Sequence, residues 1–163
     1  MTNTSPARAS SDPPRRRGER TGATEGRLAA PGLVALLLLA GCVNDTASYR
    51  IDDSQDHSIM LHRVQEWLWQ DTIKLTIAAN RMPECRGGID VRGVPLRARP
   101  ELYEAPPQYA EPIYILKIGA RHFAISTQSC RVQEFSETPP DLGRRLGTFA
   151  EKDGKFGFQP AGG

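Results

Sequence analysis

The strongest constraint on the fold of this chain is a pair of apolar segments that lie two residues apart. Residues 113–118 and 121–127 are both rich in β-branched and aromatic residues, and Gly119-Ala120 separates them. Glycine at the first of two turn residues favours a type II′ hairpin, so the segments are predicted to pair as antiparallel strands. This turn sets the register: Ile118 faces Arg121, Leu116 faces Phe123, and Tyr114 faces Ile125. Both faces are apolar away from the turn, which predicts central strands covered on two sides.

Two earlier segments alternate between apolar and polar residues, as strands do. In residues 58–64, Ile59 and Leu61 fall on one face. In residues 67–81, the predicted apolar face holds four residues at every second position: Ile73, Leu75, Ile77 and Ala79. A helix over residues 61–82 also fits the apolar spacing. We prefer the strand because β-branched residues lose side-chain freedom in a helix.

The C-terminal part of the chain carries further strand signals. Residues 101–105 form a short predicted strand that ends at Pro106-Pro107, because proline has no amide proton to donate. Residues 148–159 form a predicted hairpin that turns at Asp153-Gly154, a pair typical of type I′ turns. Together these patterns predict a mainly β domain over residues 57–160, either a small antiparallel sandwich or a partly open barrel. An α+β fold is the alternative, if the segment that fits both templates is helical.

The N-terminal part of the chain is organised like a secretory signal. Residues 28–39 form an apolar run of roughly 12 residues, within the range of about 7–15 for a signal peptide. A membrane span would need about 20 apolar residues. Residues 1–27 carry six arginines and are rich in Pro, Ser and Gly, which predicts a long disordered leader. The apolar run ends in Leu39-Ala40-Gly41-Cys42.

Leu39-Ala40-Gly41-Cys42 resembles the lipobox of bacterial lipoproteins. The resemblance implies that residues 1–41 are cleaved off and that the thiol of Cys42 is diacylated, which anchors the protein to a membrane. In enterobacterial lipoproteins an aspartate after the cysteine favours the inner membrane. Val43 stands there instead, so the resemblance implies the periplasmic face of the outer membrane, with the inner membrane as the alternative. Residues 42–56 are polar and are predicted to be a flexible tether.

The use of the other cysteines follows from this resemblance. If Cys42 carries lipid, Cys85 and Cys130 remain, and two cysteines in an oxidising compartment predict one disulfide. Closing this loop would stabilise the fold by about 4 kcal/mol on the chain-entropy model. A redox pair or a metal site is the alternative, although the chain has no Cys-x-x-Cys motif.

The two parts of the chain, before and after residue 42, differ in net charge. Six of the 21 basic residues and three of the 19 acidic residues lie before residue 42, so the remainder carries about one net negative charge. We therefore expect no nucleic-acid partner. Basic residues are densest in residues 81–99: Arg81, Arg86, Arg92, Arg97 and Arg99. We interpret this segment as a solvated, loop-rich surface, with anionic lipid, lipopolysaccharide or peptidoglycan as its alternative partner.

The two tryptophans of the chain, Trp67 and Trp69, are separated by one residue. Both fall on the predicted face of Ile73. We expect them in the core, because tryptophan buries a large area in a domain with few aromatic residues. The alternative is an exposed pair, which would mark a surface for a partner or a glycan.

The sequence contains no catalytic motif. His57 follows an acidic stretch that lacks the glycine and the distal glutamate of a calcium-binding loop. His62 and His122 lie on predicted strands without the cysteine or carboxylate partners of a zinc site. We therefore expect no cofactor and no metal ion.

These observations favour a lipid-anchored accessory protein of the cell envelope that binds another envelope protein. One alternative is a small envelope hydrolase or metal-dependent enzyme that uses His62 or His122. The other is a β-pocket, lined by Trp67 and Trp69, that binds a glycan or a lipid.

Overall fold

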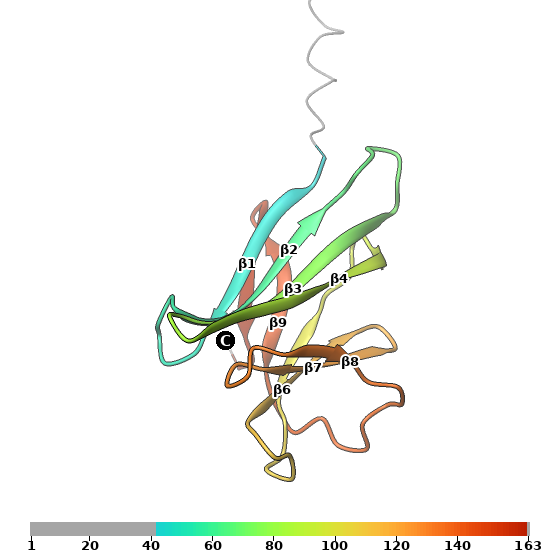
Figure 1. The fold of residues 1–163 in the computed structure, drawn as a ribbon. Coiled ribbons are helices and arrows are strands. Elements are labelled where there is room, and N and C mark those ends of the chain that lie inside the picture. The colour runs from blue at the N-terminus through green and yellow to red at the C-terminus, as the bar shows by residue number, and fades with distance from the viewer. Residues whose placement is uncertain (1–41, 163) are drawn as a thin grey trace, which may run out of the picture. The chain divides into compact units, whose positions relative to one another are not determined.

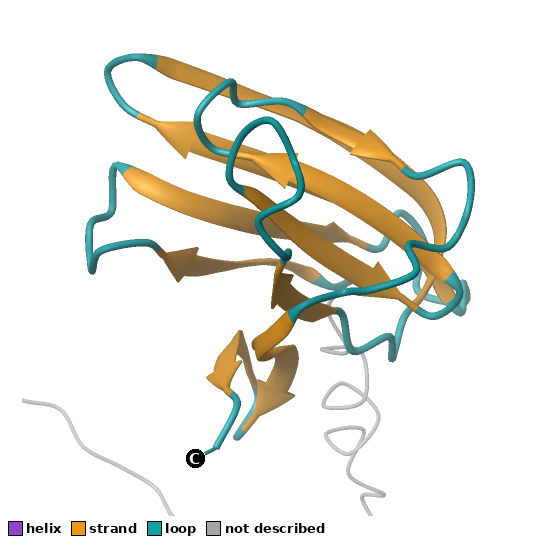
Figure 2. Ribbon diagram, turned by 90° about the horizontal axis from the view of Figure 1, so that it is seen from below, coloured by secondary structure: helices purple, strands orange, loops and turns teal. Residues whose placement is uncertain are grey.

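The computed structural model describes residues 42–162, and the predicted signal segment, residues 1–41, lies outside this range. Its strands are β1 (Asn44–Arg50), β2 (His57–Val64), β3 (Thr72–Arg81), β4 (Cys85–Pro95), β5 (Glu101–Glu104), β6 (Ile113–Ile118), β7 (Arg121–Ser126), β8 (Val132–Glu134), β9 (Arg144–Lys152) and β10 (Lys155–Pro160). They form two antiparallel sheets, ordered β1-β2-β3-β4 and β10-β9-β5-β6-β7-β8. Figures 1 and 2 show the strands in layers, with no helix among them. The predicted mainly β sandwich is confirmed, and the α+β alternative is wrong.

One hydrophobic core fills the space between the two sheets. It takes alternate residues from β2 and β3, as the period of two in the sequence predicts. The fully buried members from both sheets include Ile59, Leu61, Leu75, Ile77, Leu102, Leu116, Phe123, Ile125 and Phe149. Each sheet therefore buries its inner face against the other, which is the main source of stability in this architecture.

Both predicted hairpins form, with the predicted register. In the β6–β7 hairpin, Leu116 is opposite Phe123 and Tyr114 is opposite Ile125. Gly119 has a φ of 60°, as the first position of a type II′ turn requires. Asp153 and Gly154 both have positive φ, as in a type I′ turn between β9 and β10. Strands β6 and β7 lie inside the six-stranded sheet, as predicted for a pair with two apolar faces.

The predicted tether over residues 42–56 is wrong, because β1 lies within it. Strand β1 pairs with β2 along its whole length, and Ala47 and Ile51 belong to the core. The strand escaped prediction because it is an edge strand that turns only small or half-buried side chains inward. Tyr49 is the one large inward side chain of β1, and its ring packs 4.8 Å from that of Phe158. Only Cys42 and Val43 precede the sheet in the described chain.

The Cys85–Cys130 disulfide joins the start of β4 to the loop between β7 and β8, so it links the two sheets. The predicted pairing is confirmed. Strand β4 passes so close to this loop that a Cβ on Gly87 would overlap the carbonyl oxygen of Cys130. Only glycine allows this approach, which seats the two cysteines across from each other.

The strands of the four-stranded sheet run between two ends of the domain, which we name by their cysteines. At the Cys42 end, the backbone amide of Gln65 donates to the carbonyl of Val43, and that of Leu96 donates to the backbone carbonyl of Asp71. At the disulfide end, the backbone amide of Met82 donates to the backbone carbonyl of Asp56. Figure 1 shows the Cys42 end at the top, where β1 begins.

Candidate functional site at the Cys42 end

Cys42 is exposed, its thiol is free, and the first strand begins two residues later. Both backbone polar groups of Val43 are hydrogen-bonded to Gln65. Its carbonyl accepts the backbone N–H of Gln65 at 2.8 Å, and its own N–H donates to the side-chain oxygen of Gln65 at 3.3 Å. Any group attached to Cys42 is therefore one residue away from a fixed point of the fold.

Gln65 also holds the loop between β2 and β3, which we call the tryptophan loop (residues 65–71). The Gln65 side chain is buried, with 6% of the residue exposed. Its amide group donates to the carbonyl of Gln70 at 2.8 Å and to that of Leu68 at 3.4 Å. The amide of Gln70 closes a turn onto the carbonyl of Trp67 at 3.0 Å. One buried carboxamide thus ties the residue after Cys42 to the loop that carries both tryptophans.

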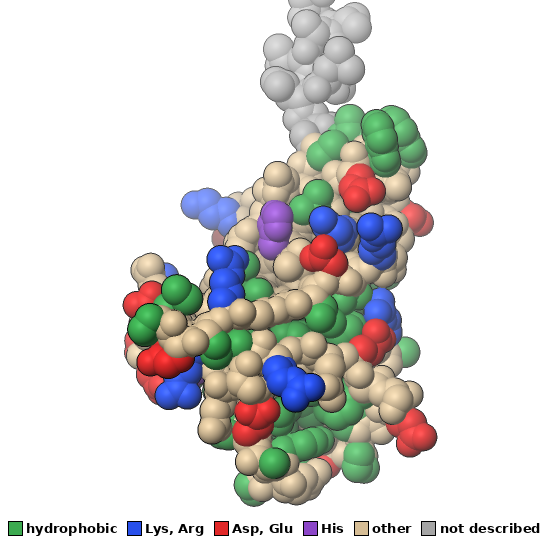
Figure 3. All heavy atoms as spheres, viewed as in Figure 1, with side chains coloured by type: hydrophobic (Ala, Val, Ile, Leu, Met, Phe, Trp, Pro, Cys, Tyr) green, Lys and Arg blue, Asp and Glu red, His purple; other side chains and the backbone are tan. Residues whose placement is uncertain are grey.

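The predicted core position of the two tryptophans is wrong, and the alternative of an exposed pair is what the structure has. Trp67 is 54% exposed and Trp69 is 79% exposed, with an exposed Leu68 between them. Their rings stack on each other, 5.3 Å apart and 20° from parallel. The alternation of β3 does not extend back to them because pairing starts at Thr72 and the loop turns before it. Figure 3 shows hydrophobic side chains gathered at this end of the molecule.

A pocket of about 480 Å³ also opens at the Cys42 end, lined by Val43, Arg63, Arg97, Arg99 and Glu151 among others. Arg63 is buried and serves the fold. Its guanidinium donates twice to the carboxylate of Asp45, at 2.6 and 2.7 Å, and lies 3.8 Å from the centre of the Phe156 ring. Arg97 and Arg99 are exposed, and neither forms an ion pair with any carboxylate of residues 42–162.

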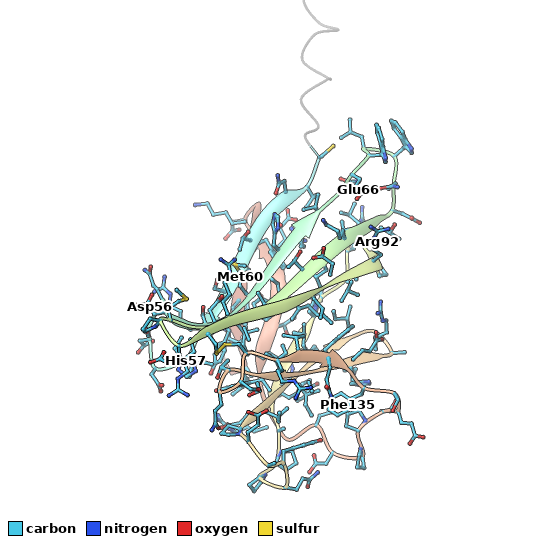
Figure 4. The ribbon with its side chains drawn as sticks, viewed as in Figure 1. Asp56, His57, Met60, Glu66, Arg92 and Phe135 are labelled. Carbon is cyan, nitrogen blue, oxygen red and sulfur yellow. A yellow bond between two sulfur atoms is a disulfide. The ribbon has the colours of Figure 1, made fainter. Side chains whose placement is uncertain are left out.

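The five arginines that are dense in the sequence do not form one patch. Most of the segment predicted as loop is strand β4, whose 11 residues extend over roughly 35 Å. Arg81 and Arg86 lie toward the disulfide end, because Arg81 is opposite Cys85. Arg92 lies further along β4 (Figure 4). Arg97 and Arg99 reach the Cys42 end. All five are exposed, so the extended strand separates charges that are close in sequence.

His62 and His122, the two candidate residues for a hydrolase or a metal-dependent enzyme, are not brought together. His62 alternates with the core residue Leu61 on β2, and its Nε2 is hydrogen-bonded to Asn44 Oδ1 at 2.8 Å. His122 alternates with the core residue Phe123 on β7, in the other sheet. The two histidines therefore occupy the outer faces of different sheets. Among residues 42–162, no three metal-binding side chains are grouped.

A contact that sequence analysis missed involves the third histidine. His57 Nε2 is hydrogen-bonded to Thr127 Oγ1 at 2.8 Å, and Asp52 Oδ2 lies 3.5 Å from His57 Nδ1. The order of groups resembles a catalytic relay, but only 5% of Thr127 is exposed, and a nucleophile must reach its substrate. We assign the contact a structural role, because it ties β2 to the end of β7 across the two sheets. No local pattern links residues 70 positions apart.

A second pocket, of about 290 Å³, lies in the loop between β5 and β6. Its lining is rich in proline and tyrosine: Pro106, Pro107, Tyr109, Pro112 and Tyr114. Burial raises the pKa of Tyr114 to about 12, so this phenol is neutral at physiological pH. The loop lies at the bottom of the domain in Figure 1, away from Cys42.

Comparison with known proteins gives no relative: no protein-family model, no curated protein and no solved structure matches the chain. In the part of the chain that the structure describes, no helix is long and apolar enough to cross a membrane.

Proposed function

We propose that this chain is a lipid-anchored lipoprotein of the bacterial cell envelope, attached through Cys42 to the periplasmic face of the outer membrane. The observation that carries this proposal is the position of Cys42. It ends the motif that resembles a lipobox, its thiol is exposed and free, and the folded domain begins two residues later. A cysteine that is to be acylated must have this accessibility.

The other two cysteines support the same compartment. Their disulfide links the two sheets, and such bonds persist in oxidising environments such as the periplasm. The short connection from Cys42 to β1 would hold the domain close to the membrane, whereas a long tether would let it range freely. The proposed lipoprotein therefore presents its sandwich in a restricted orientation.

The proposed role of the domain is to bind another protein of the envelope. The pocket between β5 and β6 supports this role, because prolines and tyrosines line it and its loop lies away from Cys42 (Figure 1). Tyrosine-rich hollows are favourable sites for a partner's side chains, since the ring buries a large area at little entropic cost. We therefore assign the partner to this pocket.

The anchor is tested on the full chain expressed in a Gram-negative host and purified from its membranes with detergent. We expect the intact mass of a polypeptide that starts at Cys42 and carries acyl chains. The Cys42→Ser variant is expected to lose both the acyl mass and the membrane fraction. An unacylated N-terminus in the wild-type protein would contradict the proposal.

The partner is tested by crosslinking in intact cells, followed by capture of the tagged lipoprotein. Tyr109→Ala is expected to abolish a crosslink that Gln133→Ala, an exposed control on β8, retains. An equal loss or an equal retention in both variants would remove the pocket from the proposal.

A further inference from the structure

We propose that the tryptophan loop docks on the bilayer beside the acylated Cys42, with Trp67, Leu68 and Trp69 inserted among the lipid headgroups. This inference rests on the proposed lipid anchor. It adds a second, non-covalent attachment that would set the orientation of the sandwich on the membrane.

Most of the exposed large hydrophobic side chains of residues 42–162 lie in this loop. Four large hydrophobic side chains are exposed among residues 42–162, and three of them are consecutive in this loop. The indole ring has an apolar body and a polar N–H, so tryptophan is enriched at membrane–water interfaces. The exposure of Trp67, Leu68 and Trp69 in succession is costly in water and favourable at a bilayer surface.

The loop is preorganised for this contact. Gln65 fixes its backbone through Leu68 and Gln70, and the two indole rings already stack on each other. A loop that is held in its binding shape loses little conformational entropy when it docks. These hydrogen bonds occupy the backbone carbonyls of Trp67, Leu68 and Gln70, and the side chains of residues 67–69 are exposed to solvent.

The position of the loop selects lipid rather than a protein or a glycan as its occupant. Gln65 bonds to Val43, so the base of the loop is fixed to the residue that follows the lipid attachment point. Acyl chains on Cys42 would bring the headgroups to this end of the domain. A large partner would then have to enter between the loop and the membrane.

The charges at this end do not favour binding to anionic lipid by attraction alone. Basic and acidic side chains are interspersed in the segments around Cys42: Arg92 (Figure 4), Arg97, Arg99, Lys152 and Lys155 with Glu66, Asp71, Glu151 and Asp153. A polybasic patch would attract anionic membranes, and the carboxylates among these cations keep the surface from being one. Docking is therefore expected to be carried by the aromatic side chains and to be insensitive to lipid charge.

The chain provides its own probe, because both of its tryptophans lie in this loop. The acylated protein, purified from the membranes of the host that expresses the full chain, is reconstituted in phosphatidylcholine vesicles with or without bromine on the acyl chains of the lipid. We expect the tryptophan emission to shift to shorter wavelength in both vesicles and to lose intensity in the brominated ones. Replacing part of the phosphatidylcholine by phosphatidylglycerol should leave this quenching unchanged.

A matched control moves the probe to the other end of the domain. In the variant Trp67→Phe, Trp69→Phe, Met82→Trp, the only tryptophan replaces a side chain that is 52% exposed in the turn between β3 and β4. Its emission is expected to be the same in brominated and unbrominated vesicles. Equal quenching of both proteins would overturn the proposed docking.

Two further outcomes separate the docking from the anchor. An acylated, vesicle-bound protein whose tryptophans stay unquenched and open to acrylamide would overturn the docking alone, and would return the loop to a glycan or protein partner. A protein whose mass shows no acyl chain would overturn the proposed anchor and the docking together.

Discussion

The two ends of the sandwich are built in different ways. At the disulfide end, Cys85 and Cys130 join the sheets covalently, and His57 bonds to a buried Thr127. At the Cys42 end, a single buried glutamine organises a loop that displays two stacked tryptophans to solvent. The covalent cross-link therefore lies far from the surface that we assign to the membrane. The exposed apolar side chains at the Cys42 end, Trp67, Leu68 and Trp69, are outside the core and remain available for binding.

The test with the largest expected effect removes the disulfide between Cys85 and Cys130. The double variant Cys85→Ser, Cys130→Ser should lose about 4 kcal/mol of unfolding free energy, because the unfolded chain regains the freedom of a closed loop. Urea denaturation followed by far-UV circular dichroism measures this loss. The stacking of the two tryptophans should survive in the folded variant. A loss below about 1 kcal/mol would show that the disulfide end is not the stabilised one.

The next test weakens the Cys42 end. Gln65→Glu keeps the size of the side chain but cannot donate to the carbonyls of Leu68 and Gln70. We expect a loss of about 2 kcal/mol, the usual cost of buried polar groups without partners. The near-UV dichroism of the stacked indoles should weaken as well. Gln128→Glu, at an exposed position near the disulfide, is the control and should change neither quantity.

A smaller effect is expected from the hydrogen bond at the disulfide end. His57→Ala removes the contact with Thr127 and should cost about 1 kcal/mol, the net contribution of a typical hydrogen bond. His62→Ala removes an exposed bond to Asn44 and should cost less than about 0.5 kcal/mol. Thermal unfolding of both variants compares them directly. An equal cost would mean that His57 does not tie the sheets.

The smallest expected effect is the most informative about function. The double variant Trp67→Ala, Trp69→Ala should change the unfolding free energy by less than about 0.5 kcal/mol, because both rings are exposed. Phe149→Ala, in the core, should cost about 3–5 kcal/mol by comparison. Circular dichroism follows both, since the double variant has no tryptophan. A large loss in the double variant would assign the pair to folding rather than docking.

The elements that could be predicted from the sequence are those with local causes. Gly119 and Asp153-Gly154 set two turns, and alternation of apolar residues then sets the registers on both sides. The pairing of Cys85 with Cys130 followed once Cys42 was assigned to lipid. The turns and registers depend on neighbours in the chain, and the disulfide depends on Cys42 being excluded from pairing.

The errors came from features that depend on distant parts of the chain. Strand β1 has little apolar character because its outer face meets solvent and its inner face is small, so its sequence is typical of a tether. The tryptophans continue the alternation of β3 in the sequence, but a turn separates them from the strand and leaves them exposed. No spacing in the sequence indicated that His57 would meet Thr127.

Antiparallel strands follow from the residues alone, because turn residues and the period of side chains act between neighbours in the chain. Which apolar residues are buried and which are exposed depends on the tertiary structure. Burial depends on what packs against a residue, and Gln65 joins Val43 to the tryptophan loop only after two strands have paired. That juxtaposition, together with the lipobox-like motif that ends at Cys42, supports the proposed membrane surface.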